Sequence, residues 1–308
     1  MLEVEPLLQE AQRYVDASRP SWSLENDVDM DTFNHLARVW VQRGEAQDHL
    51  DELLRLVAIQ HEDGGWGDRR DDPVSRIRTS AFSCQVLLRA RRAIPDPAIG
   101  AAVERGLQML LARQEEDGRW TDDRWPYLDA TSVSVGTLLF SVREPNFKEM
   151  MRAHRTAVER GMDFILAQRH GDGLWYHKPT ASPVEITAHL LQKCAIYGVD
   201  RGILQVSATS LLELQGANGD WDNQSTDATC DVVRCLILTS EQENGVELRP
   251  EIDAACERAM HWLFSISDNG SVGVRPGRPA SMLYTCDLID TVLKYQAHQH
   301  AGLAEFYQ

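Results

Sequence analysis

A signature that runs from a glutamine to a tryptophan recurs along the chain and constrains its fold more than any other feature. The copies are Gln60-His-Glu-Asp-Gly-Gly-Trp66, Gln114-Glu-Glu-Asp-Gly-Arg-Trp120, Gln168-Arg-His-Gly-Asp-Gly-Leu-Trp175 and Gln215-Gly-Ala-Asn-Gly-Asp-Trp221, with a worn fifth copy at Ser267-Asp-Asn-Gly-Ser271. Successive glutamines lie 54, 54 and 47 residues apart. Such a period indicates stacked supersecondary units, because each unit can bury its apolar face only against a neighbour.

The segments between the signatures have a helical pattern. Apolar residues recur at i, i+3, i+4 and i+7, as in Leu50, Leu53, Leu54 and Val57, and strand-like alternation of any length is missing. The Asp-Gly or Asn-Gly of each signature supplies a left-handed cap, so each signature ends one helix. A second, more apolar helix then follows. These second helices are expected at about Arg76, Asp129, Val184, Asp227 and Met282, and a further pair at Pro6–Ala17 and Met30–Arg43.

Counting these pairs predicts six hairpins and about twelve helices. The less polar helices, for example over Ser132–Val142 and Val232–Leu238, should form an inner ring, with the Glu/Arg-rich helices outside. We therefore predict an all-α fold, an α/α toroid that forms one domain over residues 1–308. In each signature the Trp should pack against the next hairpin while the Gln amide caps backbone groups.

Composition excludes several classes of partner. The net charge of -16 argues against nucleic acid and anionic membranes. No apolar run approaches the roughly 18 residues that span a bilayer, and the acidic N-terminus lacks the features of a signal peptide, so we expect a cytoplasmic protein with no transmembrane segment. The six cysteines include no C-x-x-C pair and lie mostly in apolar stretches, which favours buried, reduced thiols.

The densest acidic segment is Asp27-Val-Asp29-Met-Asp31-Thr32-Phe33, at the head of the first predicted inner helix. His35 follows Asp31 by four residues, so both share one helix face. One interpretation is a helix N-terminus at which several carboxylates are available to cap the backbone N–H groups. The other is a carboxylic acid that neighbouring carboxylates and burial keep protonated, ready to act as a Brønsted acid.

The inner helices also align on a threonine. The segments are Asp129-Ala-Thr131, Glu185-Ile-Thr187-Ala-His189, Asp227-Ala-Thr229-Cys-Asp231 and Tyr284-Thr285-Cys-Asp287. A carboxylate at a helix start is an ordinary cap, which would account for Asp129 and Glu185. Asp231 and Asp287 lie a turn deeper on helices predicted to face a cavity, so each needs a partner or a function.

Three motifs together resemble one enzyme superfamily. The signatures are similar to the QW motifs of terpene cyclases and prenyltransferases, and they cover essentially the whole chain. Ser182-Pro-Val-Glu-Ile-Thr-Ala-His189 resembles the E-x-T-A-H segment of bacterial class II diterpene cyclases. Asp29-Met-Asp31-Thr32-Phe33 resembles the D-x-D-T-T motif of drimane-type class II sesquiterpene cyclases, with Phe33 in place of the last Thr. That motif is a variant of the D-x-D-D of squalene-hopene and copalyl diphosphate cyclases.

The resemblance implies a class II terpene cyclase, an isomerase of isoprenoid biosynthesis. Its expected substrate is a linear isoprenoid diphosphate, farnesyl diphosphate first, and its product a drimane-type bicycle such as drimenyl diphosphate. Asp31 would protonate a terminal alkene, assisted by Asp29, with Asp27 and His35 in the same catalytic group. In a shifted register, Asp27-Val-Asp29-Met30, the acid would be Asp29. Drimane-type relatives are often fused to a phosphatase-like domain; no phosphatase motif occurs here, so a partner phosphatase or a homo-oligomer stays open.

Such chemistry also needs cation-stabilising and anion-binding groups. Aromatic faces stabilise carbocations and an apolar cavity excludes water. The residues predicted to line the cavity are Phe33, Trp125, Tyr127, Trp175, Asp231, Asp287 and Tyr284. Basic residues in loops before inner helices are predicted to bind the diphosphate from one rim of the toroid; they are Arg76, Arg78, His177, Lys178, Arg275 and Arg278. Mg²⁺ could accompany the diphosphate, but no D-D-x-x-D motif occurs, so we expect no protein-held metal and no organic cofactor.

Three other functions use the same predicted fold. A zinc prenyltransferase β subunit needs Asp, Cys and His on one metal ion, but Asp227/Cys230 and Cys286/Asp287 lack the D-x-C spacing and no matching His follows. A non-catalytic toroid could bind isoprenoids or a partner protein. Acid pairs would also suit a carbohydrate-active toroid, although the loops do not show the motifs of those enzymes.

Overall fold

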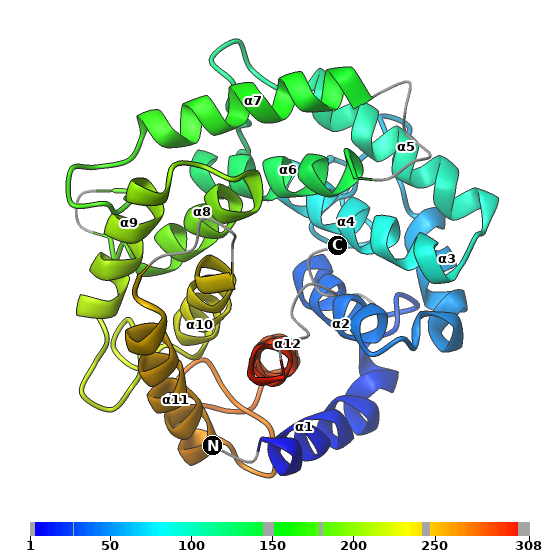
Figure 1. Cartoon of the computed structure of the whole chain (residues 1–308). Helices are drawn as coiled ribbons and strands as arrows, with labels where there is room; N and C mark the ends of the chain where they lie inside the picture. Colours follow the sequence, from blue (N-terminus) through cyan, green and yellow to red (C-terminus); the bar gives the residue numbers. More distant parts are fainter. Residues whose placement is uncertain (1–3, 27, 144–150, 179–180, 242–246, 301–308) are drawn as a thin grey trace. The chain divides into compact units, whose positions relative to one another are not determined.

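The computed structural model describes residues 4–26, 28–143, 151–178, 181–241 and 247–300 (Figure 1). Within these ranges it contains helices and three isolated β-bridges but no β-strand, as an all-α fold requires. The α-helices are α1 (Glu5–Ser18), α2 (Met30–Gln42), α3 (Leu50–Ala58), α4 (Ile77–Ala93), α5 (Pro97–Ala112), α6 (Tyr127–Ser141), α7 (Met151–Ala167), α8 (Val184–Tyr197), α9 (Arg201–Glu213), α10 (Thr226–Glu241), α11 (Arg249–Ile266) and α12 (Met282–Gln299). Two 3₁₀ helices, η1 (Arg19–Trp22) and η2 (Ala46–His49), flank α2.

The chain divides into two compact units. One covers Arg19–Ala167 and holds α2 to α7; the other joins Met1–Ser18 to Gln168–Gln308 and holds α1 and α8 to α12. In the second unit α1 packs against α12, and Gln296 Nε2 donates a hydrogen bond of 3.0 Å to Glu5 Oε2. The helix that opens the chain is therefore part of the C-terminal unit. A single domain over residues 1–308 stays a prediction.

Inner and outer helices alternate within each unit as the polarity pattern predicts. In α10, 14 of 16 residues are buried, whereas in α9 only 4 of 13 are. A helix buried on all sides must have neighbours around it; α10 packs against α8, α12 and α11, and α6 packs against α4 and α7. The predicted starts of α8 and α12 are correct, and Arg76 is the N-cap of α4.

The signature residues join each helix pair to the next. Gln60 Nε2 donates to the carbonyl oxygens of Gly64 (2.8 Å) and Ala102 (2.9 Å), so it bonds both its own turn and the following outer helix. Trp66 is fully buried, and its Nε1 donates to the Leu56 carbonyl at 2.8 Å. The same bonds recur at Gln114 and Trp120 and at Gln215 and Trp221. The capping role predicted for the Gln is confirmed at these three joints, and the Trp66 and Trp120 rings lie against Gly106 and Gly161 of the next outer helix, as predicted.

The glycine of the signature is required by close packing. Gly64 has φ +88°, and a Cβ placed on it would lie 2.5 Å from the Arg105 carbonyl oxygen. Only glycine fits a left-handed turn pressed against another backbone. Gly118 and Gly219 meet the next outer helix in the same way. The turn therefore fixes the distance between consecutive outer helices.

The cysteines and the helix lengths agree with the expectations from composition. All six cysteines are free and buried, and burial raises the pKa of Cys84 to about 12. Thiols with so high a pKa are poor metal ligands at neutral pH. None of the described helices combines the length and the apolarity that crossing a bilayer demands.

Candidate functional site

The head of α2 is held in place by its own acidic motif. Asp29 is the N-cap, and its Oδ1 accepts a hydrogen bond of 2.8 Å from the backbone N–H of Thr32. An Asp at this position satisfies a helix donor that has no partner within the helix. The Met30 N–H donates to the Asp68 carbonyl at 2.9 Å, and Asp29 pairs with Arg69 in a β-bridge. Asp29 therefore has a structural role, and it fixes where the next acid points.

Asp31 lies in the first turn of α2 and forms an ion pair across to α4. Its Oδ1 is 2.7 Å from Arg78 Nη1 and 3.7 Å from His35 Nδ1. Burial raises the pKa of Asp31 most strongly, but the charges of Arg78, His35 and Arg38 together outweigh burial, so that the pKa of Asp31 is lowered. The prediction that neighbouring carboxylates and burial keep Asp31 protonated is therefore wrong, because the nearest charged group is a guanidinium.

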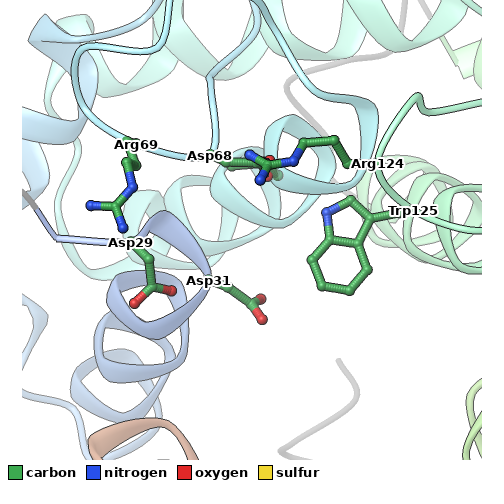
Figure 2. Close-up of a pocket in the computed structure, with 7 residues that line it drawn as sticks. Asp29, Asp31, Asp68, Arg69, Arg124 and Trp125 are labelled. Atoms are coloured by element: carbon green, nitrogen blue, oxygen red, sulfur yellow. Dashed lines mark hydrogen bonds and ion pairs between the residues drawn. The ribbon is translucent and has the colours of Figure 1, made fainter.

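A cavity of about 340 Å³ opens beside Asp31 (Figure 2). We call it the α2 pocket; its lining residues are Asp29, Asp31, Asp68, Arg69, Thr79, Arg124 and Trp125. The Trp125 ring carries the Arg78 guanidinium 4.0 Å from its centroid. Asp68 is 3.0 Å from Arg124 and accepts a hydrogen bond of 2.6 Å from Thr79 Oγ1. The pocket thus combines two ion-paired carboxylates with one aromatic face.

Other residues predicted to be catalytic or to line a cavity have different positions. Asp27 lies outside the described residues. Phe33 is fully buried and meets Trp40 edge-on at 6.0 Å, which corrects its predicted cavity role to a core role. Trp175 is likewise fully buried in its hairpin, where its backbone N–H donates to Thr187 Oγ1, so it too is a core residue.

Tyr127 and Tyr284 are half-buried, on α6 and α12. Tyr127 packs edge-on against Phe164 of α7 at 5.9 Å and does not line the α2 pocket. Of the five aromatic residues predicted to face a cavity, Trp125 is the one that lines this pocket.

The predicted diphosphate ligands fall into two kinds. Arg76 and Arg78 are already ion-paired, Arg76 with Asp72 at 4.0 Å and with Asp123 at 3.4 Å. The others occupy loops before inner helices: His177 is half-buried and Lys178 exposed before α8, and Arg275 and Arg278 are exposed before α12. That the basic residues lie together on one rim of the toroid stays a prediction.

A second group of charges occupies the C-terminal unit, which we call the α10 network. It consists of Glu185 and His189 on α8, Asp227, Asp231 and Arg234 on α10, and Asp287, Asp290 and Lys294 on α12. Arg234 is at its centre. Its Nη1 is 2.9 Å from Asp287 Oδ1 and 3.4 Å from Asp290 Oδ2, and its Nη2 contacts Asp231 Oδ1. Lys294 Nζ lies 2.7 Å from Asp290 Oδ1.

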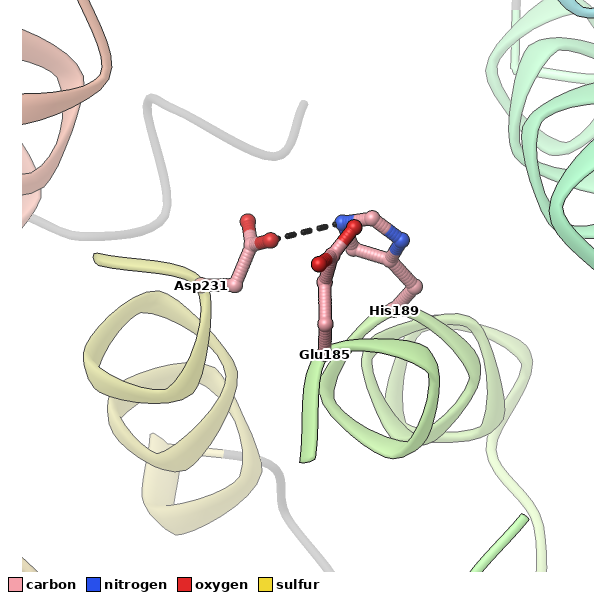
Figure 3. Close-up of side chains that lie close together, drawn as sticks. All are labelled: Glu185, His189 and Asp231. Carbon is pink, nitrogen blue, oxygen red and sulfur yellow. Dashed lines mark ion pairs between the residues drawn. The ribbon is translucent and has the colours of Figure 1, made fainter. Parts of the chain in front are cut away.

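The α10 network holds more acids than permanent cations. Asp231 Oδ2 is 2.8 Å from His189 Nε2 (Figure 3). Burial raises the pKa of Asp231, but His189 and Arg234 outweigh burial and lower it far below its usual range. Asp227 behaves in the opposite way: burial, then the charges of Asp231 and Asp287, raise the pKa of Asp227 well above its usual value. Five carboxyl groups face two permanent cations here, and this excess of acids favours the protonated form of Asp227.

Sequence reasoning missed three of the eight residues of this network. It selected Asp231 and Asp287 as acids in need of partners but did not find Arg234, Asp290 or Lys294. The spacing contained a signal, because Asp231 and Arg234 are i,i+3 and Asp290 and Lys294 are i,i+4 on helices predicted to be buried. Charged residues at such positions need partners.

Comparison with solved structures identifies the class of fold. The chain is similar to the apo type II terpene cyclase MstE from Scytonema, with a TM-score of 0.70 and 13% identity over 96% of this chain and 99% of that one. A variant of MstE in complex with geranylgeranyl dihydroxybenzoate, its substrate, matches at a TM-score of 0.66 and 15% identity, again over 96% and 99%.

Carbohydrate enzymes share the likeness. A GH76 alpha-mannanase from Bacteroides thetaiotaomicron matches at a TM-score of 0.69 and 10% identity over 97% of both chains, and a polysaccharide lyase at 0.66 and 12% over 95% of this chain and 96% of that one. No protein-family model and no curated protein sequence matches this chain. These likenesses show the fold class, the predicted all-α α/α toroid.

Proposed function

We propose that this protein is a type II terpene cyclase, which protonates a linear isoprenoid and closes rings on the resulting cation. The observation that carries the proposal is the α2 pocket, where the Asp31 carboxyl group and the Trp125 ring line the same cavity of about 340 Å³. The likeness to a type II terpene cyclase and the resemblance of Asp29–Phe33 to a cyclase acid motif support the same assignment.

In the proposed reaction Asp31 delivers the proton. Arg78 Nη1 donates to Oδ1, while His35 Nδ1 bonds the Asp31 carbonyl oxygen, so we assign the transferred proton to Oδ2. The electron pair of the terminal alkene takes the proton from Oδ2, forming a C–H bond and a tertiary cation. Arg78, which covers one face of the Trp125 ring, stabilises the carboxylate that remains, and the opposite face of that ring is proposed to stabilise the cation. The next alkene then attacks the cation to close a ring, and loss of a proton ends the sequence.

The lowered pKa of Asp31 fits a donor that must be a strong acid. A carboxyl group whose anion is stabilised by Arg78 gives up its proton more readily than an ordinary one. At neutral pH a carboxyl group with a lowered pKa is mostly ionised. An apolar substrate that displaces water strengthens the effect of burial, which already raises the pKa of Asp31 most, and so increases the protonated fraction.

The geometry changes the role proposed for Arg78. In farnesyl diphosphate the terminal alkene and the diphosphate are at opposite ends of the chain. A diphosphate bound by Arg78 would lie beside the acid, because Arg78 is 2.7 Å from Asp31. We therefore assign Arg78 to Asp31. Diphosphate binding is proposed for His177, Lys178, Arg275 and Arg278, with Mg²⁺ as counterion, and a drimane-type diphosphate that a partner phosphatase could hydrolyse is the proposed product.

The test is incubation with farnesyl and geranylgeranyl diphosphates and with geranylgeranyl dihydroxybenzoate, in H₂O and in D₂O. After dephosphorylation, mass spectrometry should find cyclic products that contain one deuterium per molecule when formed in D₂O, since the first step adds a solvent-derived proton. Linear alcohols alone would count against a cyclase. Tight prenyl diphosphate binding without turnover would indicate a binding protein, and cleavage of mannan or of an acidic polysaccharide would indicate a carbohydrate enzyme.

A further inference from the structure

We propose that Glu185, His189 and Asp231 form a binding site for one divalent transition-metal ion. Each residue offers one ligand atom, and these atoms all lie within 4.8 Å of one another. His189 Nε2 and Asp231 Oδ2 are 2.8 Å apart. Metal–ligand bonds of roughly 2.1 Å place neighbouring ligand atoms about 3 Å apart, so this pair already has the spacing of two ligands on one ion.

The site is built on helices that pack against each other. Glu185 and His189 are one turn apart on α8, so both side chains leave the same face of that helix. Asp231 comes from α10, which is in extensive contact with α8. Figure 3 shows the three side chains converging between these two helices. Ligands on packed helices keep their geometry better than ligands on loops.

The charges around the three residues favour a cation. Arg234 contacts Asp231 through Oδ1, so it does not occupy Oδ2, the oxygen next to His189. Its own charge is matched by Asp287 and Asp290. A surplus of negative charge therefore remains, because Glu185 and Asp227 add two further carboxyl groups to the same network. A divalent ion would neutralise that surplus.

The donor set indicates the kind of metal. One imidazole nitrogen and two carboxylate oxygens suit Mn²⁺, Co²⁺ or Zn²⁺, whereas Mg²⁺ and Ca²⁺ prefer oxygen ligands alone. Glu185 is exposed and the His189 side chain retains 27% of its accessible surface, so the remaining coordination positions are open to water or to an anionic oxygen. No cysteine belongs to this set, which separates it from the zinc site of a prenyltransferase.

The test measures metal occupancy and needs no activity. Protein treated with EDTA and dialysed is titrated with MnCl₂ and ZnCl₂ by calorimetry, and bound Mn²⁺ is examined by pulsed electron paramagnetic resonance. We expect one ion per chain and a nitrogen coupling from the imidazole. His189→Ala should weaken Mn²⁺ binding at least about tenfold and remove the nitrogen coupling. Glu185→Gln should weaken Mn²⁺ binding by a similar factor. A factor of ten corresponds to about 1.4 kcal/mol of binding free energy.

The matched controls are His300→Ala and Glu213→Gln, which change exposed residues of the same unit away from the site. Both should bind Mn²⁺ as the unsubstituted protein does. Absence of binding by the unsubstituted protein, or equal binding by all four variants, would overturn the proposal and leave an ion-pair network only. Because this experiment measures bound metal, it can disprove the metal site while cyclic products are still found. It can equally support the metal site when no cyclic product is found.

Discussion

Two groups of acids lie on inner helices of this chain, and they differ in how their charge is matched. In the α2 pocket, Asp31 of α2 has a cation of its own, because Arg78 of α4 lies 2.7 Å away. In the α10 network, Arg234 and Lys294 pair with three of the five carboxyl groups, those of Asp231, Asp287 and Asp290. The pKa of Asp31 is consequently lowered, whereas the pKa of Asp227 is raised well above its usual value.

The comparison shows that a count of acids does not give their protonation state. A carboxylate that has its own cation is ionised at neutral pH. The same cation lowers the pKa of the carboxyl group, so its protonated form is a stronger acid than an ordinary carboxylic acid. A surplus of carboxylates has to take up a proton or a metal ion. The two regions are therefore suited to different chemistry: proton delivery in the α2 pocket and cation binding in the α10 network.

The largest expected effect tests which region supplies the proton. Asp31→Asn removes the transferable proton while preserving the size of the side chain, and we expect cyclisation to fall by about 10³-fold or more. Initial rates with farnesyl diphosphate, measured as cyclic product, give the answer. Asp29→Asn is the matched control, because Asn retains the N-cap and should cost much less. Full activity of the Asp31→Asn protein would move the acid to the α10 network.

The next effect concerns stability. Arg234→Met leaves Asp231, Asp287 and Asp290 buried without their shared cation, and removing one partner of a buried ion pair typically costs about 3–5 kcal/mol. Urea denaturation should show this loss in the free energy of unfolding. Arg78→Met should cost less, since its partner Asp31 is 24% exposed and can be hydrated. Equal losses would contradict the difference between the two regions.

The pH dependence of kcat/KM distinguishes the two acids without any substitution. A donor must be protonated, so if Asp31 is the donor its lowered pKa predicts a rate that rises about tenfold per pH unit from pH 8 to pH 5, with no plateau. A donor with a raised pKa, such as Asp227, would instead give a plateau at low pH and a fall only above that pKa. Profiles in matched buffers would separate these outcomes.

The smallest effect is on how stability varies with pH. Because the pKa of Asp227 is raised in the folded state, its contribution to stability is complete below its unfolded pKa and is lost as the pH rises through the folded pKa. Asp227→Asn should therefore lose less stability between pH 5 and pH 9 than the unsubstituted protein. Melting temperatures across that range test the prediction, and parallel curves would contradict it.

Much of the scaffold could be predicted from sequence because it depends on local periodicity. The Gln and Trp of each signature act on backbone groups, so their roles follow from the repeat itself, and the starts of α8 and α12 were placed correctly. The helix starts predicted at Asp129 and Asp227 are two residues and one residue late. Pro126 immediately precedes α6 and Ser225 immediately precedes α10, so the acids lie inside these helices.

The pairing of charges could not be predicted in the same way. Arg78 and Asp31 are 47 residues apart, and their contact depends on the rotation of two helices, which apolar periodicity does not specify to within one side chain. The sequence therefore predicts that Asp29–Phe33 lies at the head of an inner helix, but it does not predict the ion pair with Arg78 that lowers the pKa of Asp31. The same limit hid Arg234, whose partner Asp287 is 53 residues away.

The joints between helix pairs have an evolutionary consequence. Each is made from a glutamine amide, a glycine, a buried indole and carbonyl oxygens, and a carbonyl oxygen is present at every residue. The threonines Thr131, Thr187 and Thr229 of the inner helices accept hydrogen bonds from the signature tryptophans, but the acids beside them do not, so the acids can change without rebuilding the frame. Divergence of function at constant architecture is the expected history of such a chain.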